Sequence, residues 1–363
     1  MQIKDNFSGI LGEGIHTAVS GCRFEGSVKS GGNASGIVGN AVMTSISSSY
    51  VNAQLEGRSA SGIAAFAMNK LDVSGCMTEG SIVASDSAGG ICAGFRPFEN
   101  EEKSCIQNCI SQMDIRIQER TKGMVGYAGG IAGIGGSKER GLEIENCLVL
   151  GTISCGENSW IGGVAASAKS CTHTVSAQTY LHSGQANAQI SIFGDCVTKE
   201  CLCYNEIEAE EGFYYGDKAV DGQVLARKKT YEDLGWDFAS VWDFSESGYP
   251  YLRSLSDKLG QWPFPFVRIL GLEEEGRLRL KADTPISFSG IYGKQMSKIR
   301  FQSCTKNEEL MAVRISDALG SAQDGQEFCL NFGMLSEPGI YQFVLQYLRE
   351  ERKHTVSIPV TIE

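Results

Sequence analysis

A short glycine-containing motif recurs along the first half of the chain, and it constrains the fold more than any other feature. The motif is a small residue, Gly, an aliphatic residue, any residue, then Gly or Ala. Its central glycines are 27, 26, 28, 40 and 33 residues apart, at Gly9, Gly36, Gly62, Gly90, Gly130 and Gly163. A period in this range is typical of a solenoid, in which each unit buries its apolar face only by stacking on its neighbours. Such a fold builds a long surface without prescribing any chemistry.

A second pattern runs in phase with the first. About half a period after each early glycine, a Cys or another small residue precedes a short alternating segment bounded by Gly, Asn or Ser. Examples are Cys22 before 23–28, Cys76 before 77–82 and Cys147 before 148–153. Segments of this kind are typical of strands of about five residues, and no window has a sustained helical period. We therefore predict a β-solenoid with glycine at its corners.

These residues match a known family pattern. The Gly-Gly-Ile-x-Gly motif alternating with Asn-Cys-x-x-x-Gly-x-Ile resembles the GLUG repeat of bacterial cell-surface and secreted proteins. The aromatic-rich segment 230–252 looks like the segment that ends such arrays, so the resemblance covers about residues 1–255. It implies an all-β fold, a right-handed parallel β-helix-like solenoid, on an extracellular bacterial protein that is often an adhesin. The longer steps and the stretch 170–205 depart from the pattern.

The sequence divides into three predicted regions. Residues 1–205 are the repeats, 206–260 an aromatic-rich capping segment and 261–363 a second domain, beginning at a Pro-flanked, stiff linker. We expect the capping aromatics to plug the open end of the repeats, since they bury large areas. A carbohydrate-binding platform is the alternative. The aromatics are Trp236, Phe238, Trp242, Phe244, Tyr249 and Tyr251.

The C-terminal region has the pattern of short strands separated by turn residues. Seven or eight strands within about 100 residues are typical of an immunoglobulin-like β-sandwich. Cys304 and Cys329 could form a disulfide there, which their spacing alone does not show. We assign no site to this region. The expected strands are 267–270, 277–281, 286–289, 298–302, 311–315, 327–331, 340–347 and 355–362.

Bulk properties narrow the possible partners. The net charge of −11 argues against nucleic acid and against adsorption to anionic membrane. No apolar run approaches the roughly 20 residues needed to span a bilayer. No secretion signal is visible, so we expect a fragment of a longer extracellular or cell-surface protein; an intact chain whose first strand is covered by a partner is the rival interpretation. A monomer is favoured.

The 13 cysteines are an odd number, which disfavours a complete disulfide framework. Four of them occupy the same place in successive repeats, so we predict an inward stack of free thiols. They are Cys22, Cys76, Cys109 and Cys147. A tighter cluster lacks the spacing of a zinc site, so we expect no metal and no cofactor. Its members are Cys196, Cys201 and Cys203, with Cys171, His173 and His182 upstream.

Insertions in solenoids gather on one face and often bind ligands. The first long step contains Phe95, Arg96 and Phe98, a second insertion spans 135–140, and a third spans 170–189. Because aromatic and Arg side chains on loops are good contact anchors, we select six candidate ligand-contact residues: Phe95, Arg96, Phe98, His173, Tyr180 and His182. Ordinary surface loops remain the simpler interpretation.

The predicted function is that of a non-enzymatic, adhesin-like protein that binds an extracellular glycan or a host or bacterial surface protein, or that serves as a stalk. Common nucleophile, metal and phosphate-binding motifs are absent. A carbohydrate-active β-helix enzyme is one alternative, since six carboxylates could meet on one face; a trimeric phage or injection-type fibre is another. The carboxylates are Glu99, Glu101, Glu102, Asp114, Glu143 and Glu145.

Overall fold

The computed structural model forms two compact units. The first contains Met1–Val220, Glu232–Asp243 and Tyr251–Lys258; the second contains Asp221–Tyr231, Phe244–Pro250 and Leu259–Glu363. The predicted capping segment is thus divided between the units, and we call two of its parts in the first unit, Glu232–Asp243 and Tyr251–Lys258, the strap. The structure describes residues 6–98, 103–118, 125–156, 159–178, 180–183, 190–206, 208–209, 218–258, 263–272, 277–293, 296–311, 315–318, 326–349 and 352–363.

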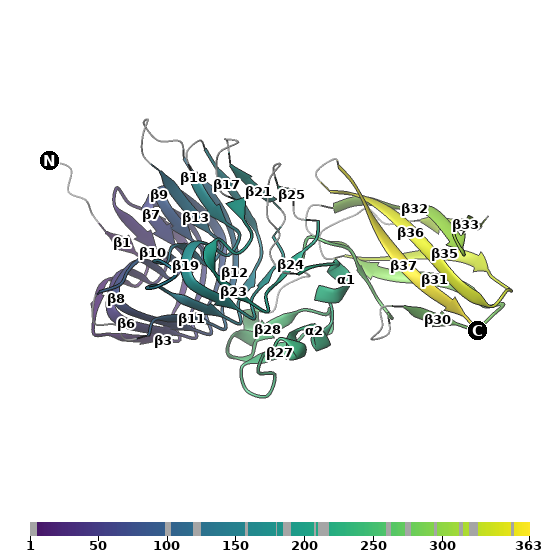
Figure 1. Ribbon diagram of the computed structural model, residues 1–363, viewed down its shortest axis with the longest axis horizontal. Coiled ribbons are helices and arrows are strands. Elements are labelled where there is room, and N and C mark those ends of the chain that lie inside the picture. Colours follow the sequence, from purple (N-terminus) through teal and green to yellow (C-terminus); the bar gives the residue numbers. More distant parts are fainter. Residues whose placement is uncertain are drawn as a thin grey trace. The chain divides into compact units, whose positions relative to one another are not determined.

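Two long parallel sheets build the first unit (Figure 1). The sixteen-stranded sheet contains β1 (Phe7–Ser8), β4 (Arg23–Lys29), β5 (Asn33–Ser35), β7 (Tyr50–Ser61), β9 (Met77–Gly89), β12 (Ile110–Ile117), β13 (Gly126–Gly129), β16 (Leu148–Val149), β17 (Thr152–Cys155), β18 (Ser159–Gly162), β20 (Val175–Ser176), β21 (Tyr180–Ser183), β22 (Ile190–Ser191), β24 (Leu202–Tyr204), β25 (Glu208–Ala209) and β26 (Ala219–Val220). The ten-stranded sheet contains β2 (Leu11–Ile15), β3 (Ala18–Ser20), β6 (Val38–Ser47), β8 (Ala64–Ser74), β10 (Cys92–Arg96), β11 (Cys105–Gln107), β14 (Ala132–Ile134), β15 (Glu143–Glu145), β19 (Ala165–Thr172) and β23 (Asp195–Lys199).

The chain passes from one sheet to the other and back in each coil, and each strand pairs in parallel with its equivalents in the coils before and after. Strand β7 pairs with β4 and β9, and β8 pairs with β6 and β10. Inward-facing aliphatic side chains therefore stack in continuous ladders. One ladder, fully in register, is Leu55, Ile82, Ile115, Ile153 and Leu181. The expectation of an all-β chain with solenoid-like parallel sheets is confirmed.

The repeated glycines form one corner of the coils, and backbone packing explains why they are glycines. The Gly36 N–H donates to the Gly62 carbonyl at 2.9 Å, and the Gly62 N–H donates to the Gly90 carbonyl at 3.0 Å. A Cβ on Gly36 would lie 2.6 Å from the Gly62 oxygen, and one on Gly62 would lie 2.5 Å from the Gly90 oxygen. Coils can approach this closely only without a side chain. The aliphatic residue after Gly9, Ile10, is exposed at the first coil, whereas those after the other five glycines are fully buried: Ile37, Ile63, Ile91, Ile131 and Val164.

The opposite corner, which we call the cysteine corner, has its own two-residue signature. Its first residue has a left-handed backbone, which favours Gly and Asn: Gly21, Ser48, Gly75, Asn108, Asn146, His173 and Glu200. The next residue donates its thiol or hydroxyl hydrogen to the carbonyl two residues back. These distances are 2.9 Å for Ser49, 3.2 Å for Cys109 and 3.0 Å for Thr174. Cys, Ser and Thr interchange here because each supplies one small donor.

The strap lies along the cysteine corner. The indole N–H of Trp236 donates to the carbonyl of His173 at 2.7 Å, and that of Trp242 donates to the side-chain oxygen of Asn108 at 3.1 Å. The two indole rings pack against each other with centroids 4.3 Å apart and planes tilted by 31°. His173 and Asn108 occupy equivalent positions in different coils, so the aromatic residues connect several coils along one side.

The other end of the strap reaches the first coils. The guanidinium of Arg23 forms a two-pronged ion pair with the carboxylate of Asp257. The ammonium of Lys258 lies 2.9 Å from Glu25 and 4.4 Å from the ring centre of Tyr50. The expectation that Trp236 and Trp242 plug an open end is therefore wrong. These side chains brace the flank, because their partners are corner groups of two different coils on the same side of the sheets.

The second unit contains two mainly antiparallel sheets. A cluster of phenylalanines fills the space between them, with the Phe288 and Phe343 centroids 4.9 Å apart. The four-stranded sheet contains β29 (Arg268–Ile269), β31 (Pro285–Ile291), β34 (Ile315–Ala318) and β35 (Glu327–Met334), and the five-stranded sheet contains β30 (Leu278–Leu280), β32 (Met296–Lys306), β33 (Glu309–Leu310), β36 (Gly339–Arg349) and β37 (Arg352–Ile362). The remaining elements of the chain are α1 (Gly222–Leu225), α2 (Lys228–Asp233), β27 (Trp242–Phe244), β28 (Pro250–Leu252) and the 3-10 helix η1 (Arg253–Lys258).

Cys304 and Cys329 are both free and lie in different sheets. Cys304 is buried, whereas Cys329 is exposed and lies 3.2 Å from the hydroxyl of Ser287. The two side chains therefore have different surroundings, and no disulfide joins them. Within the described part of the chain, no helix has the length and apolar character needed to cross a bilayer.

Candidate ligand-binding site

Phe95, Arg96 and Phe98 differ in their exposure. Phe95 and Arg96 belong to β10, where Phe95 is buried and Arg96 is exposed. Phe98 follows the strand and is 62% exposed. The prediction of three loop residues is therefore wrong for Phe95 and Arg96, because the strand extends into the insertion.

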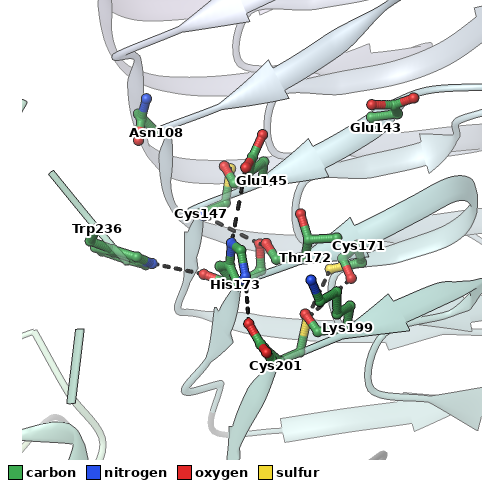
Figure 2. Close-up of polar contacts among 12 residues, drawn as sticks. Asn108, Glu143, Glu145, Cys147, Cys171, Thr172, His173, Lys199, Cys201 and Trp236 are labelled. Carbon is green, nitrogen blue, oxygen red and sulfur yellow. Dashed lines mark hydrogen bonds and ion pairs between the residues drawn. The ribbon is translucent and has the colours of Figure 1, made fainter. Parts of the chain in front are cut away.

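His173 lies at the cysteine corner (Figure 2). Its Nε2 atom is 2.8 Å from a carboxylate oxygen of Glu200, and its Nδ1 atom is 3.9 Å from one of Glu145. Its carbonyl accepts the hydrogen bond from Trp236. Through these contacts His173 connects neighbouring coils to one another and to the strap, so it is not a loop residue.

Tyr180 and His182 belong to β21, which pairs with β17. Their side chains lie outside the described part of the structure. The six candidate residues thus come from three places: β10 and the residues just after it, the cysteine corner, and β21. Their role in ligand contact stays a prediction.

The carboxylates considered for catalysis do not share one face. Asp114 belongs to β12 of the sixteen-stranded sheet, whereas Glu143 and Glu145 belong to β15 of the ten-stranded sheet. Burial alone would raise the pKa of Glu143, but hydrogen bonds from Lys103 and Lys169 lower it below its usual value. A general acid needs the opposite shift. Glu99, Glu101 and Glu102 lie outside the described residues.

The cysteines of the first unit are free and mostly buried. Of the four cysteines predicted to stack, Cys76, Cys109 and Cys147 do so, and burial raises the pKa of Cys76 and Cys109 well above the usual value. Cys22 is only half-buried and has Ser49, not a cysteine, at the equivalent position of the next coil, so the prediction is wrong for Cys22. In the second cluster, the sulfur atoms of Cys171 and Cys201 are 3.7 Å apart. Across the described residues, no group of three or more His, Cys, Asp or Glu side chains is arranged to hold a metal ion.

Buried thiols predict an alkaline loss of stability. Burial raises the pKa of Cys92 from 9.0 to about 12. Above about pH 9 the unfolded chain ionises this thiol while the folded chain does not, so the free energy of unfolding falls by about 1.4 kcal/mol per pH unit up to about pH 12. Cys92→Ala should remove this part of the alkaline fall in the free energy of unfolding. Ala is a suitable replacement because the register partners of Cys92 are Ala64 and Ala132.

Urea unfolding of the reduced wild type and Cys92→Ala at pH 8, 9, 10 and 10.5 measures this effect. Below pH 9 the difference between the two proteins should be constant. Above pH 9 the wild type should lose stability faster. Parallel curves over the whole range would show that Cys92 ionises equally in both states.

A groove of about 680 Å³ crosses the outer face of the sixteen-stranded sheet. It extends over β4, β7, β9 and β12, and thus over successive coils. The lining residues are small or polar and include no aromatic side chain: Glu25, Gly26, Ser27, Asn52, Ala53, Gln54, Gly80, Ser81 and Asp114.

A row of small residues forms the floor of this groove. Gly26, Ala53 and Gly80 are register partners in adjacent strands. Gly26 has φ 147° and Gly80 has φ 115°, values that other residues rarely adopt, and a Cβ on Gly80 would collide with the carbonyl of Ala53. Bulges and glycines bend strands locally, so the face is hollowed here.

Polar side chains form the two walls. Glu25 and Asn52 are register partners on one side of the floor, and Ser27, Gln54 and Ser81 are register partners on the other. Because parallel strands are about 4.8 Å apart, hydrogen-bonding groups repeat at that spacing along the groove.

The two carboxylates of the groove lining, those of Asp114 and Glu25, are each bound by a neighbouring residue. The carboxylate of Asp114 accepts a hydrogen bond from Thr152 at 2.8 Å, and Glu25 pairs with Lys258 of the strap. The amide groups of Asn52 and Gln54 can both donate and accept hydrogen bonds. The groove therefore suits a hydroxyl-rich, extended ligand better than an apolar one.

Sequence reasoning missed this groove. Neighbouring residues within each wall are 27 positions apart in the chain and look like ordinary surface residues of alternating strands. The visible signal is Gly26 and Gly80 at the same place in their repeats, followed in each case by Ser. Such glycines inside a strand often mark a bend or a close approach of a ligand.

No protein-family model and no curated protein matches the chain. Among solved structures, one similar chain is the crystal structure of a "putative immunoglobulin A1 protease" from Bacteroides ovatus. It is 19% identical, with a TM-score of 0.46, and the match covers 67% of this chain and 76% of that one.

Proposed function

We propose that this chain is a non-enzymatic, adhesin-like binding protein of the bacterial surface or extracellular space, and that it holds an extended glycan in the groove of the sixteen-stranded sheet. The groove itself is the observation that supports the proposal. Its polar side chains repeat along a bent, glycine-floored surface, and repeated hydrogen-bonding groups suit a polymer of repeated hydroxyl groups.

The fold assignment belongs to the same proposal. Residues 1–205 form a right-handed parallel β-helix of the GLUG-repeat type, and residues 261–363 form an immunoglobulin-like spacer. The glycine corner and the cysteine corner support the first assignment, because both elements of the motif have a backbone role at every coil. Two sheets around a phenylalanine core support the second. The chain acts as a monomer.

The carboxylate positions favour binding over cleavage. Hydrolysis of a glycosidic bond uses two carboxyl groups on either side of one bond. Asp114 in the groove and Glu143 lie in different sheets, and the lowered pKa of Glu143 is unsuitable for an acid catalyst. Glycan that binds without being shortened is the expected behaviour.

Removal of two groove amides should weaken glycan binding. An array of host and bacterial glycans, probed with the labelled, reduced chain, identifies the ligand. Asn52→Ala with Gln54→Ala should then reduce affinity about fivefold to 150-fold, because two hydrogen bonds of about 0.5–1.5 kcal/mol each are lost. The control is Glu56→Gln, an exposed residue of the same strand whose partner is Lys29 outside the groove lining.

The outcomes separate the possibilities. A blank array would contradict glycan binding and favour a stalk or a protein-binding surface. A glycan that binds the double variant and the control equally well would place the ligand elsewhere. Shortening of the bound glycan on incubation would identify an enzyme, and a trimer in light scattering would favour a fibre.

A further inference from the structure

The ten-stranded sheet has an interruption where two neighbouring coils carry insertions. In the coils on either side of these two, one unbroken strand crosses this sheet, β8 before them and β19 after them. In the two coils between β8 and β19, the strand is broken into β10 and β11 and then into β14 and β15. The interruption leaves a cavity of about 180 Å³, room for about six water molecules. Its lining is Asn69, Phe95, Lys103, Ser104, Gly141, Glu143 and Lys169.

Two lysines bring positive charge to this cavity. The Lys103 ammonium lies 2.7 Å from one oxygen of Glu143, and the Lys169 ammonium lies 2.8 Å from the other. Each ammonium has three donors, and these contacts account for one donor of each. Among the lining residues, two positive charges thus lie against one negative charge, with Glu145 further away on the Lys103 side.

The cavity also contains an unused acceptor. The side-chain oxygen of Asn69 is shielded from solvent and has no hydrogen-bond partner among the residues that the structure describes. A buried polar atom without a partner is costly and is an exception in folded proteins. Asn69 has a left-handed backbone, with φ 68°, so its position is fixed by the strand irregularity. A ligand hydroxyl that donates to this oxygen would satisfy it.

Phe95 supplies the apolar part of the lining. Its side chain is 4% exposed and lies in the wall beside the lysines. The face of a sugar ring is apolar while its rim bears hydroxyl groups, so an aromatic wall with polar neighbours suits a sugar. A small inorganic anion would leave both Phe95 and the Asn69 oxygen unused.

We propose that this cavity binds a sugar that bears a carboxylate, of the hexuronic acid class. The carboxylate accepts hydrogen bonds from Lys103 and Lys169, a ring hydroxyl donates to Asn69, and the ring packs against Phe95. The site lies on the other sheet from the groove and does not depend on it. Binding should weaken as salt is added, because the lysines are partly exposed.

Titration calorimetry with glucuronate and galacturonate, compared with glucose and inorganic phosphate, tests this site in the full chain. A uronate should bind at least tenfold more tightly than glucose and phosphate. Lys103→Gln with Lys169→Gln should reduce uronate affinity at least tenfold, because both carboxylate donors are lost. Lys138→Gln is the matched control, since Lys138 is also paired with a carboxylate, that of Asp195 at 2.7 Å, outside the cavity.

A second variant separates binding from folding. Asn69→Asp keeps the shape and tolerates the left-handed backbone, but it replaces a neutral acceptor with a negative charge. It should abolish uronate binding with an unchanged circular dichroism spectrum. Equal binding of phosphate and uronate would identify a general anion site and overturn the proposal, as would uronate binding that survives the lysine double variant. The groove variant Asn52→Ala with Gln54→Ala should leave uronate binding unchanged.

Discussion

Gly62→Ala is expected to destabilise the first unit by about 3 kcal/mol or more, the upper part of the range for an added methyl group in a packed core. The new Cβ would lie 2.5 Å from the Gly90 carbonyl oxygen and closer still to a methyl carbon of Thr78. Neither neighbour can move easily. The Gly90 carbonyl accepts the N–H of Gly62 itself, and Thr78 is fully buried. Relief of the collision therefore requires separation of two coils.

Gly31→Ala is the matched control for this change. A Cβ on Gly31 would meet nothing within 4 Å, and its φ lies outside the left-handed region. The same substitution should therefore be neutral or stabilise the protein by up to about 1 kcal/mol, through the lower entropy of the unfolded chain. Thermal and urea unfolding of both variants measure the difference. If Gly62→Ala costs no more than Gly31→Ala, close approach of the coils does not explain the repeated glycines.

The parallel sheets were predictable because the backbone at each corner of the coils requires particular residue types, and these residues recur in the sequence. Gly36 and Gly62 recur where a Cβ would strike the next coil, and Asn108 and Asn146 recur where the backbone is left-handed. Both requirements are local to a corner and hold in every coil, so they appear in one sequence as a period. The thiol stack was predictable for the same reason.

The strap was not predictable because its partners are distant. The aromatic character of Trp236 and Trp242 indicates burial but does not specify the surface that they contact. Their hydrogen bonds go to His173 and Asn108, 63 and 134 residues away. The two indole rings could be buried against an end of the repeats or against their side. Only the three-dimensional position of the cysteine corner distinguishes these two arrangements.

The two candidate sites were predictable to different degrees. The insertions that include Phe95 and residues 135–140 mark the place where the ten-stranded sheet is interrupted, so the region of the lysine-lined cavity was visible in the repeat lengths. The groove was not visible, because its walls depend on the register of β4, β7 and β9. A shift of one residue would turn Asn52 and Gln54 to the other face.

Trp242→Ala is expected to release the strap. The Trp242 side chain is fully buried, packs against Trp236 and donates a hydrogen bond to Asn108. The Trp242 carbonyl accepts a hydrogen bond of 2.8 Å from Arg253. Removal of a buried Trp typically costs about 3–5 kcal/mol. Because the coils have their own ladders, the sheets should remain folded while the strap detaches. Limited trypsin digestion should then cut after Arg253 and Lys258 much faster than in the wild type, with little change in the circular dichroism spectrum.

Trp160→Ala is the control for loss of an indole ring. Trp160 is 38% exposed on β18, and its ring centre is 6.3 Å from that of Tyr127. Its removal should cost no more than about 1.5 kcal/mol, and it should leave the tryptic pattern of the strap unchanged. Equal digestion of the two variants would show that general destabilisation, rather than release of the strap, exposes Arg253.

Arg23→Ala distinguishes a flank brace from an end plug. Arg23 belongs to β4 in the first coils and pairs with Asp257, whereas Trp236 contacts His173 several coils away. A brace along the side predicts faster cleavage after Lys258 in Arg23→Ala, since one anchor of that end is lost, while the buried Trp242 keeps Arg253 protected. A plug over the end near His173 predicts no effect of Arg23 on either cleavage. Faster cleavage confined to Lys258 would therefore show that the strap is anchored coil by coil, which explains how a short aromatic segment can stabilise coils distant from its own place in the chain.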